Sequence, residues 1–182
     1  MEEFKTIEND VQVELVEKKS KFIADLFYIE SIKDAENIIK NIKKKYFDAR
    51  HHCIAYRVIE DEKIIERAND DGEPSGTAGA PMLNILRKNE LANVLIIVTR
   101  YFGGTLLGTG GLVRAYSESL LKAIEKSEII KKILGEEFEV TLEYNDFEKF
   151  KYYCKNNDIN IVKTEYMDKI ICRIEVIKNR KR

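Results

Sequence analysis

A chain of 182 residues is long enough for one compact domain and a second, smaller one. Its 44% hydrophobic residues can build a core, and the formal net charge of -1 excludes the broad positive excess of proteins that hold nucleic acid by bulk electrostatics. An RNA-binding surface would need its basic residues gathered on one face, so the overall charge neither supports nor excludes RNA binding.

The cysteines and the N-terminal residues indicate the compartment. Cys53, Cys154 and Cys172 lie far apart and form no CxxC pair, a pattern typical of reduced thiols in the cytosol. The first residues are acidic and lack an apolar signal core, and no segment approaches the ~20 apolar residues that a membrane span needs. The sequence predicts a soluble, cytoplasmic protein with no membrane partner.

Hydrophobic periodicity divides the first half of the chain into strands and one helix. Ser31 suits a helix N-cap, and apolar residues at helical spacing then continue to about Lys45. Alternation or branched apolar residues mark the strands. The expected strands cover residues 11–15, 22–29, 52–59 and 63–68.

Glycine-containing loops are expected in the middle of the chain. Residues 69–79 are rich in glycine, aspartate and proline and predict a loop, followed by a short helix over 81–86. Residues 94–98 form an unbroken branched apolar run, the pattern of a central strand covered on both faces. Further expected loops are 100–104 and 108–111, and the expected helix after them is 112–126.

Gly135 marks an expected domain boundary, because a new alternating strand begins at 138–142. Asp146 could cap a helix, and strands at 159–166 and 170–177 would complete a β-α-β-β unit. The predicted domains are 1–132 and 135–182.

The strongest local signal is a buried strand that leads through a glycine-rich loop into a helix, over residues 94–126. The first amides of a helix have no internal partners and, with the helix dipole, suit a phosphate or carboxylate. Glycines let the backbone approach such an anion, and arginines could add charge-assisted hydrogen bonds. The candidate ligand- or RNA-binding residues are Arg100, Tyr101, Gly103, Gly104, Gly108, Gly110, Gly111 and Arg114. An alternative stays open: the glycines only permit tight turns, since the motif is neither a Walker A sequence nor the GxGxxG fingerprint.

A second candidate is the acidic loop that carries Asp70, Asp71 and Glu73. Three carboxylates within four residues could hold a hard cation or act as acid and base. The loop lacks the twelfth-position ligand of an EF-hand, and a solvated acidic turn is the favoured interpretation.

The histidines form a third, accessory candidate. His51 and His52 adjoin Cys53, and in a strand His51 and Cys53 would share one face while His52 takes the other. A zinc site or a Cys–His nucleophile would need further partners brought together by the fold, so a packed strand is favoured. No metal site and no cofactor is predicted.

Several of these motifs occur together and in order, and the chain resembles the IMPACT family on them. They are His51-His52-Cys53 with Ala55-Tyr56, Asp71-Gly72-Glu73-Pro74, Gly76-Thr77-Ala78-Gly79, and the run from Arg100 through Gly111-Leu112 to Arg114-Ala115-Tyr116. The resemblance covers residues 20–126 strongly and the rest more loosely.

The resemblance implies an α+β fold. Its N-terminal α/β domain would share the fold of a small-subunit ribosomal protein, domain IV of elongation factor G and the GHMP kinases. A small ferredoxin-like β-α-β-β domain would follow, lacking the closing helix and strand of bacterial relatives. Eukaryotic relatives are linked to translational control through an additional N-terminal domain, so that specific role is not transferred.

Two functional hypotheses follow. The preferred one is a translation-linked regulatory protein that binds RNA, the ribosome or a translation factor through the glycine-rich loop and its arginines. The basic run 43–45 would join this surface only if it shared a side with Arg100 and Arg114. The alternative is an enzyme that acts on a phosphorylated small molecule with the carboxylates of the acidic loop. Catalytic residues and the oligomeric state stay open.

Overall fold

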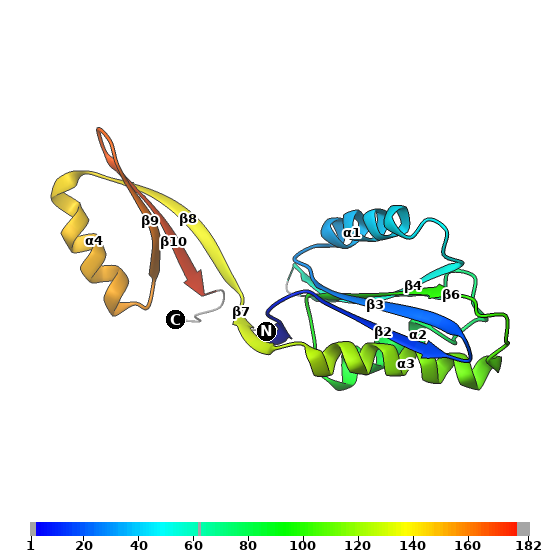
Figure 1. Ribbon diagram of the computed structural model, residues 1–182. Coiled ribbons are helices and arrows are strands. Elements are labelled where there is room, and N and C mark those ends of the chain that lie inside the picture. The colour runs from blue at the N-terminus through cyan, green and yellow to red at the C-terminus, as the bar shows by residue number, and fades with distance from the viewer. Residues whose placement is uncertain (1–2, 62, 178–182) are drawn as a thin grey trace. The chain divides into compact units, whose positions relative to one another are not determined.

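The computed structural model describes residues 3–61 and 63–177, which group into two compact units (Figure 1). The larger unit comprises Phe4–Lys131, and the smaller one holds Glu3 and the described residues from Lys132 onward. Strands β1 (Glu3–Ile7) and β7 (Ile129–Ile133) pair with each other. Neither segment was predicted as an element, because periodicity is hard to distinguish in five residues.

A five-stranded antiparallel sheet forms the centre of the larger unit, in the order β2-β3-β6-β4-β5. All residues of the central strand except the last are buried, which confirms the prediction of a strand covered on both faces. The strands are β2 (Val11–Glu17), β3 (Ser20–Tyr28), β4 (His51–Glu60), β5 (Lys63–Asn69) and β6 (Val94–Tyr101).

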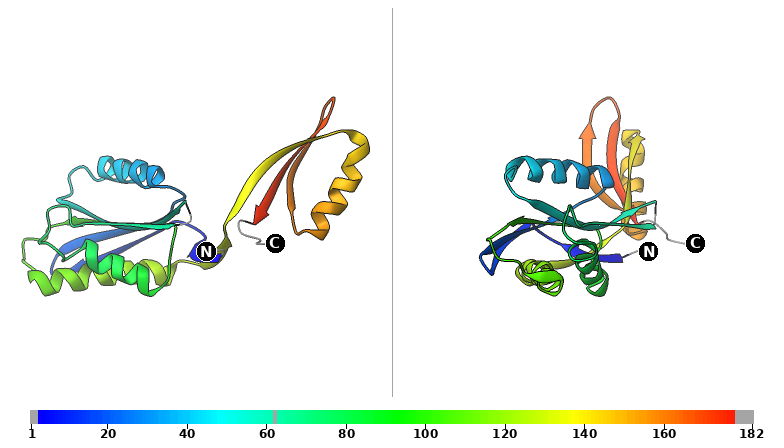
Figure 2. Two further views of the ribbon diagram at one scale, coloured as in Figure 1. Left: turned by 180° about the vertical axis from the view of Figure 1, so that it is seen from behind. Right: turned by 90° about the vertical axis from the view of Figure 1, so that its right-hand side faces the viewer.

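Helices cover the two faces of this sheet unequally. Helices α2 (Gly79–Lys88) and α3 (Gly108–Lys126) lie side by side on one face, and α1 (Ile32–Lys45) lies alone on the other (Figures 1 and 2). Successive residues of a strand point to opposite faces of the sheet, so β4 contributes to the cores on both faces. Cys53 and Ala55 belong to the core under α2 and α3, whereas Ile54 and Tyr56 belong to the core under α1.

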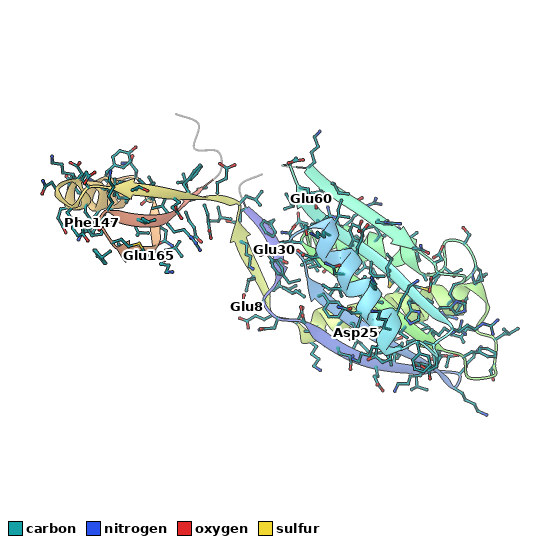
Figure 3. The ribbon with its side chains drawn as sticks, turned by 90° about the horizontal axis from the view of Figure 1, so that it is seen from above. Glu8, Asp25, Glu30, Glu60, Phe147 and Glu165 are labelled. Atoms are coloured by element: carbon teal, nitrogen blue, oxygen red, sulfur yellow. The ribbon has the colours of Figure 1, made fainter. Side chains whose placement is uncertain are left out.

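Helix α1 begins where the sequence predicted. The Ser31 hydroxyl accepts a hydrogen bond from the Asp34 N–H at 3.1 Å. The Glu60 carboxylate, labelled in Figure 3, accepts a second one from the Ile32 N–H at 2.6 Å. Two orphan amides of the first turn are thereby satisfied. No helix among the described residues is both long enough and apolar enough to span a membrane.

Three predicted boundaries around the glycine-containing loops were wrong. Strand β6 continues to Tyr101, so Arg100 belongs to the strand and not to a loop. Helix α2 begins at Gly79, two residues before the predicted start. Helix α3 begins at Gly108, so three glycines expected in a loop form its first turn. Glycine disfavours helix interiors by about 1 kcal/mol, which made a later start look better in sequence.

The smaller unit is a three-stranded antiparallel sheet with one helix. Its elements are β8 (Gly135–Leu142), α4 (Tyr144–Asn156), β9 (Asn160–Tyr166) and β10 (Ile170–Ile177), with strand order β8-β10-β9. Phe147 of α4, labelled in Figure 3, packs in a core with Ile170, Cys172 and Ile174. The N-cap is Glu143, and Asp146 lies instead in the first turn, where its charge favours the helix dipole.

Candidate functional site

A cleft of about 320 Å³ opens in the larger unit where the acidic loop meets the start of α3. The fold therefore brings together the two loops that the sequence singled out separately. Residues from four segments line the cleft: Arg50 and His51; Gly72, Glu73 and Pro74; Arg100 and Phe102; and Leu106, Leu107, Gly108, Thr109 and Leu112.

A buried ion pair joins the end of β6 to the acidic loop at this cleft. Arg100 Nη1 donates to Glu73 Oε1 at 2.6 Å, and the two side chains are only 6% and 3% exposed. The Tyr116 hydroxyl donates to the same carboxylate oxygen at 2.7 Å. Arg100 Nη2 donates to Ser20 Oγ at 3.3 Å, and the guanidinium lies 5.5 Å from the centre of the Phe22 ring. This network fixes the end of β6 against the acidic loop, because breaking a buried pair leaves an uncompensated charge.

The other two carboxylates of the acidic loop serve different partners. Asp70 Oδ1 accepts from the N–H groups of Ala78 and Gly79 at 3.0 and 2.8 Å, so it satisfies the start of α2. Asp71 accepts from the His52 N–H at 2.7 Å and pairs with Lys43 at 2.8 Å.

Burial alone would raise the pKa of the Asp71 carboxyl. The Lys43 ammonium and the His52 N–H outweigh that effect and hold its pKa below the ordinary value. Asp70, Asp71 and Glu73 thus point to three separate partners. Within residues 3–61 and 63–177, no group of three His, Cys, Asp or Glu side chains is placed to hold a metal ion.

The histidines lie on opposite faces of β4. His51 Nδ1 is 2.9 Å from the Asp71 carbonyl oxygen, which can only accept, so Nδ1 carries the proton. Its Nε2 lies 3.9 Å from Glu73 Oε2 at the cleft. His52 Nε2 lies 3.0 Å from the carbonyl oxygen of Tyr46, on the α1 face.

Cys53 is not activated as a nucleophile. Its thiol donates to the Asp70 carbonyl oxygen at 2.9 Å. Burial raises the pKa of the Cys53 thiol to about 12, and the nearby Glu73 charge adds to the effect, so the thiolate is not populated near neutral pH. A Cys–His nucleophilic pair is therefore not formed here.

Helix α3 begins at the cleft, and its N-terminus is not capped. It has no side-chain cap and no acidic residue in its first turn, in contrast to α2, whose first amides bond to Asp70. Gly108 has a φ of +73°, a conformation that favours glycine, and Gly108 and Thr109 both line the cleft. Unpaired helix amides and the dipole at this end attract an anion.

The remaining loop glycines differ in role. A Cβ on Gly103 would lie 2.0 Å from the Lys19 carbonyl carbon, so glycine is needed for the close approach to the turn between β2 and β3. Its N–H donates to Ser20 Oγ at 3.2 Å. Gly104 and Gly110 are exposed and have open space around them, and Gly111 packs on Leu107.

Arg50 and Phe102 line the cleft and were missed by sequence reasoning. Arg50 is exposed, and its guanidinium lies 5.8 Å from the centre of the Phe102 ring. Arg50 forms no ion pair with any residue that the structure describes. The available signal was its position directly before the strand that carries His51. Arg114 is exposed on α3 and does not line the cleft, and Tyr101 donates to Asp48 at 2.8 Å outside it.

Comparison with known proteins decides the family. Residues 18–124 match the Impact N-terminal domain, and residues 140–181 match a domain of unknown function, DUF1949. The chain belongs to the IMPACT family. The resemblance predicted from its motifs is thereby confirmed.

Relatives in the IMPACT family align over most of the chain. The IMPACT family member YvyE of Bacillus subtilis (strain 168) is 36% identical over 165 residues, covering 91% of this chain and 76% of YvyE. YigZ of Escherichia coli (strain K12) is 33% identical over 158 residues, covering 86% and 78% of the two chains.

A crystal structure described as that of a hypothetical protein aligns with a TM-score of 0.73 at 32% identity. The alignment covers 97% of this chain and 86% of that one. The α+β fold, an N-terminal α/β domain followed by a small C-terminal one, is confirmed.

Proposed function

We propose that this IMPACT-family chain is an RNA-binding protein of the translation machinery, and that its cleft holds a backbone phosphate. One observation carries the proposal: the uncapped N-terminus of α3 and the unpaired Arg50 face the same cleft. Helix amides and an arginine fork are two of the groups that bind phosphate best in proteins.

The charges around the cleft favour an anion. Arg100 and Glu73 neutralise each other across 2.6 Å, which leaves Arg50 and the α3 dipole as the unbalanced charges. A hydrogen bond to a charged group contributes about 1.5–3 kcal/mol, so Arg50 alone could account for a tenfold or larger change in affinity. The ring of Phe102, 41% exposed at the cleft, offers a surface on which an unpaired base can stack.

The bonding of the three carboxylates makes catalysis the less favoured function. A general base needs a free lone pair within reach of substrate, and the three carboxylates of the acidic loop are bonded to a helix start, to Lys43 and to Arg100. The link to translation is supported by membership of the IMPACT family and by the resemblance that it carries.

One observation favours the alternative of an enzyme acting on a phosphorylated small molecule. His51 Nε2 faces the cleft beside Glu73, and the volume of about 320 Å³ is in the range of small-molecule pockets. A phosphate on the start of α3 would place the rest of such a substrate near this imidazole.

The test is co-sedimentation of the purified protein with ribosomes at low and moderate salt. Arg50→Ala is the informative variant, because Arg50 is exposed and its loss should leave the fold intact. Arg114→Ala is the matched control, an exposed arginine outside the cleft. Arg100→Ala is avoided, since it would strand the buried Glu73 charge.

The proposal expects salt-sensitive binding that Arg50→Ala weakens about tenfold or more and Arg114→Ala leaves nearly unchanged. Equal losses in both variants would indicate diffuse electrostatic attraction without a role for the cleft. Absence of binding by the unaltered protein at low salt would refute the proposal. A thermal-shift screen of phosphorylated metabolites against the unaltered protein and His51→Gln would then test the enzyme.

A further inference from the structure

A second concavity lies on the opposite face of the sheet, between α1 and the edge strand β5. It has a volume of about 640 Å³. We call it the basic groove. The residues that define it are Ile39, Lys40, Lys43, Lys44, Phe47, Ile54, Tyr56 and Arg67, and the acidic Glu36 and Asp71 also line it.

One stripe of α1 forms the first wall of the basic groove. Lys40 and Lys44 are four residues apart on one side of the helix, Ile39 lies beside them, and Phe47 follows in the turn after the helix ends at Lys45. Strands β4 and β5 form the floor and the opposite wall. Tyr56 and Arg67 lie directly opposite each other in the ladder and face the groove together.

The groove exists because the sheet is half covered on this side. Strands are about 4.8 Å apart and a helix is about 10 Å wide, so two helices are needed to cover five strands. Helices α2 and α3 do so on one face, whereas α1 lies alone on the other (right-hand view of Figure 2). No second helix of the described chain covers the β4–β5 side of the α1 face.

The rim of the groove is positively charged. Lys40, Lys44 and Arg67 are exposed, and none of them forms an ion pair within the described part of the chain. Lys43 pairs with Asp71 at 2.8 Å, so these two charges cancel. The exposed carboxylate of Glu36 also lines the groove, so three unpaired cations against this one further carboxylate leave a positive excess in a chain whose formal net charge is -1.

The floor is apolar. Ile39 and Ile54 line it with Tyr56, and Phe47 stands 82% exposed at one end. The ring of Tyr56 is 2% exposed, so its face is closed to a stacking base. An apolar floor whose one well-exposed aromatic ring is Phe47 at its end, with a basic rim, matches a ligand that carries apolar side chains on one side and carboxylates on its edges better than it matches nucleic acid.

We propose that the basic groove binds an acidic amphipathic helix of a partner protein. The helix would lie beside α1 on β4 and β5, with apolar side chains on Ile39, Ile54 and Phe47. Its carboxylates would pair with Lys40, Lys44 and Arg67. The site is on the other face of the sheet from the core under α2 and α3, and the inference does not rest on the proposed role of the cleft.

The test uses a fluorescein-labelled peptide of about 15 residues, long enough for four helical turns, with leucines on one face and glutamates on the other. Fluorescence anisotropy measures its binding to the full chain at low salt. A peptide with lysines in place of the glutamates and a single-stranded oligonucleotide are the comparison probes.

Two variants remove the proposed contacts. Lys40→Glu/Lys44→Glu reverses the rim charge, and Phe47→Ala removes an apolar contact; all three side chains are exposed, so the fold should persist. Lys33→Glu/Lys88→Glu is the matched control, with the same charge change outside the groove.

The expected result is binding of the acidic peptide that both groove variants weaken, the charge reversal by tenfold or more, while the control changes it less than about threefold. Failure of the acidic peptide to bind, or equal weakening by the control, would overturn the proposal. Oligonucleotide binding that the groove variants abolish, without peptide binding, would also overturn it and identify the groove as a nucleic-acid surface.

Discussion

The ion pair between Arg100 and Glu73 gives the sharpest test of the site's architecture. Glu73→Gln keeps an acceptor for the Tyr116 hydroxyl but leaves the Arg100 charge without its partner. The Arg100 side chain is only 6% exposed and lies over the Phe22 ring, so water cannot replace the lost carboxylate. Arg100→Met keeps the stem of the side chain and leaves the Glu73 charge unpaired. Breaking a buried pair costs about 3–5 kcal/mol, a large part of the 5–15 kcal/mol by which a typical domain is stable.

The double variant Glu73→Gln/Arg100→Met separates the ion pair from packing. Neither group is then charged, so no buried charge is left without compensation. Replacing a buried pair by neutral groups of similar volume is often close to neutral. We therefore expect the double variant to lose no more than about half of the summed single losses of about 6–10 kcal/mol, which corresponds to a coupling energy of at least about 3 kcal/mol.

Urea unfolding followed by far-UV circular dichroism gives these free energies. Amide hydrogen exchange in β3, β4 and β6 assigns the transition to the larger unit, because the chain contains two compact units. Additive losses, or single losses below about 1 kcal/mol, would show that Arg100 and Glu73 do not form a buried pair in solution.

Three further predictions concern positions around the site. Asp70→Ala should destabilise the larger unit by about 1–2 kcal/mol, measured by urea unfolding, because the start of α2 loses its acceptor. Gly103→Ala should lower the free energy of unfolding by more than about 2 kcal/mol, since the new Cβ would lie 2.0 Å from the backbone of Lys19. Gly110→Ala, with open space around the position, should be neutral or stabilising, and equal effects of the two substitutions would contradict the close approach. Burial raises the pKa of the Asp25 carboxyl above its ordinary value of 3.8. The stability that the protonated carboxyl contributes to the folded state is therefore fully present below pH 3.8 and is lost as the pH rises through the pKa of the folded state. Asp25→Asn should therefore gain stability relative to the unaltered protein between about pH 4 and pH 7, and a constant difference across this range would contradict the raised pKa.

Much of the fold could be predicted because strong local patterns agreed with it. The branched apolar run at residues 94–98 is the central strand β6, and the cap at Ser31 begins α1. Boundaries at glycines were predicted less well. Gly108 begins α3 with a positive φ, a backbone conformation that glycine adopts readily. The average cost of glycine applies to helix interiors and does not describe this exposed first turn.

The functional residues were predicted in part. The glycine loop and the acidic loop were both singled out, and Glu73 and Arg100 meet across 2.6 Å. Arg50 was missed because a lone arginine before a strand has no distinctive spacing. The basic run 43–45 was expected to join a surface with Arg100 only if the fold allowed it, and Lys43 and Lys44 instead line the basic groove on the α1 face.

The sequence by itself determined the family, the order of the main strands and helices, and the two loops that meet at the cleft, because these depend on local periodicity and on contiguous motifs. Only the tertiary structure decided what each charged side chain does. Asp70, Asp71 and Glu73 are near neighbours in sequence, yet one bonds to the start of α2, one pairs with Lys43 and one is buried against Arg100. The role of a carboxylate depends on its burial and on partners that lie up to 43 residues away in this chain, and neither is encoded in the spacing of the acidic residues themselves.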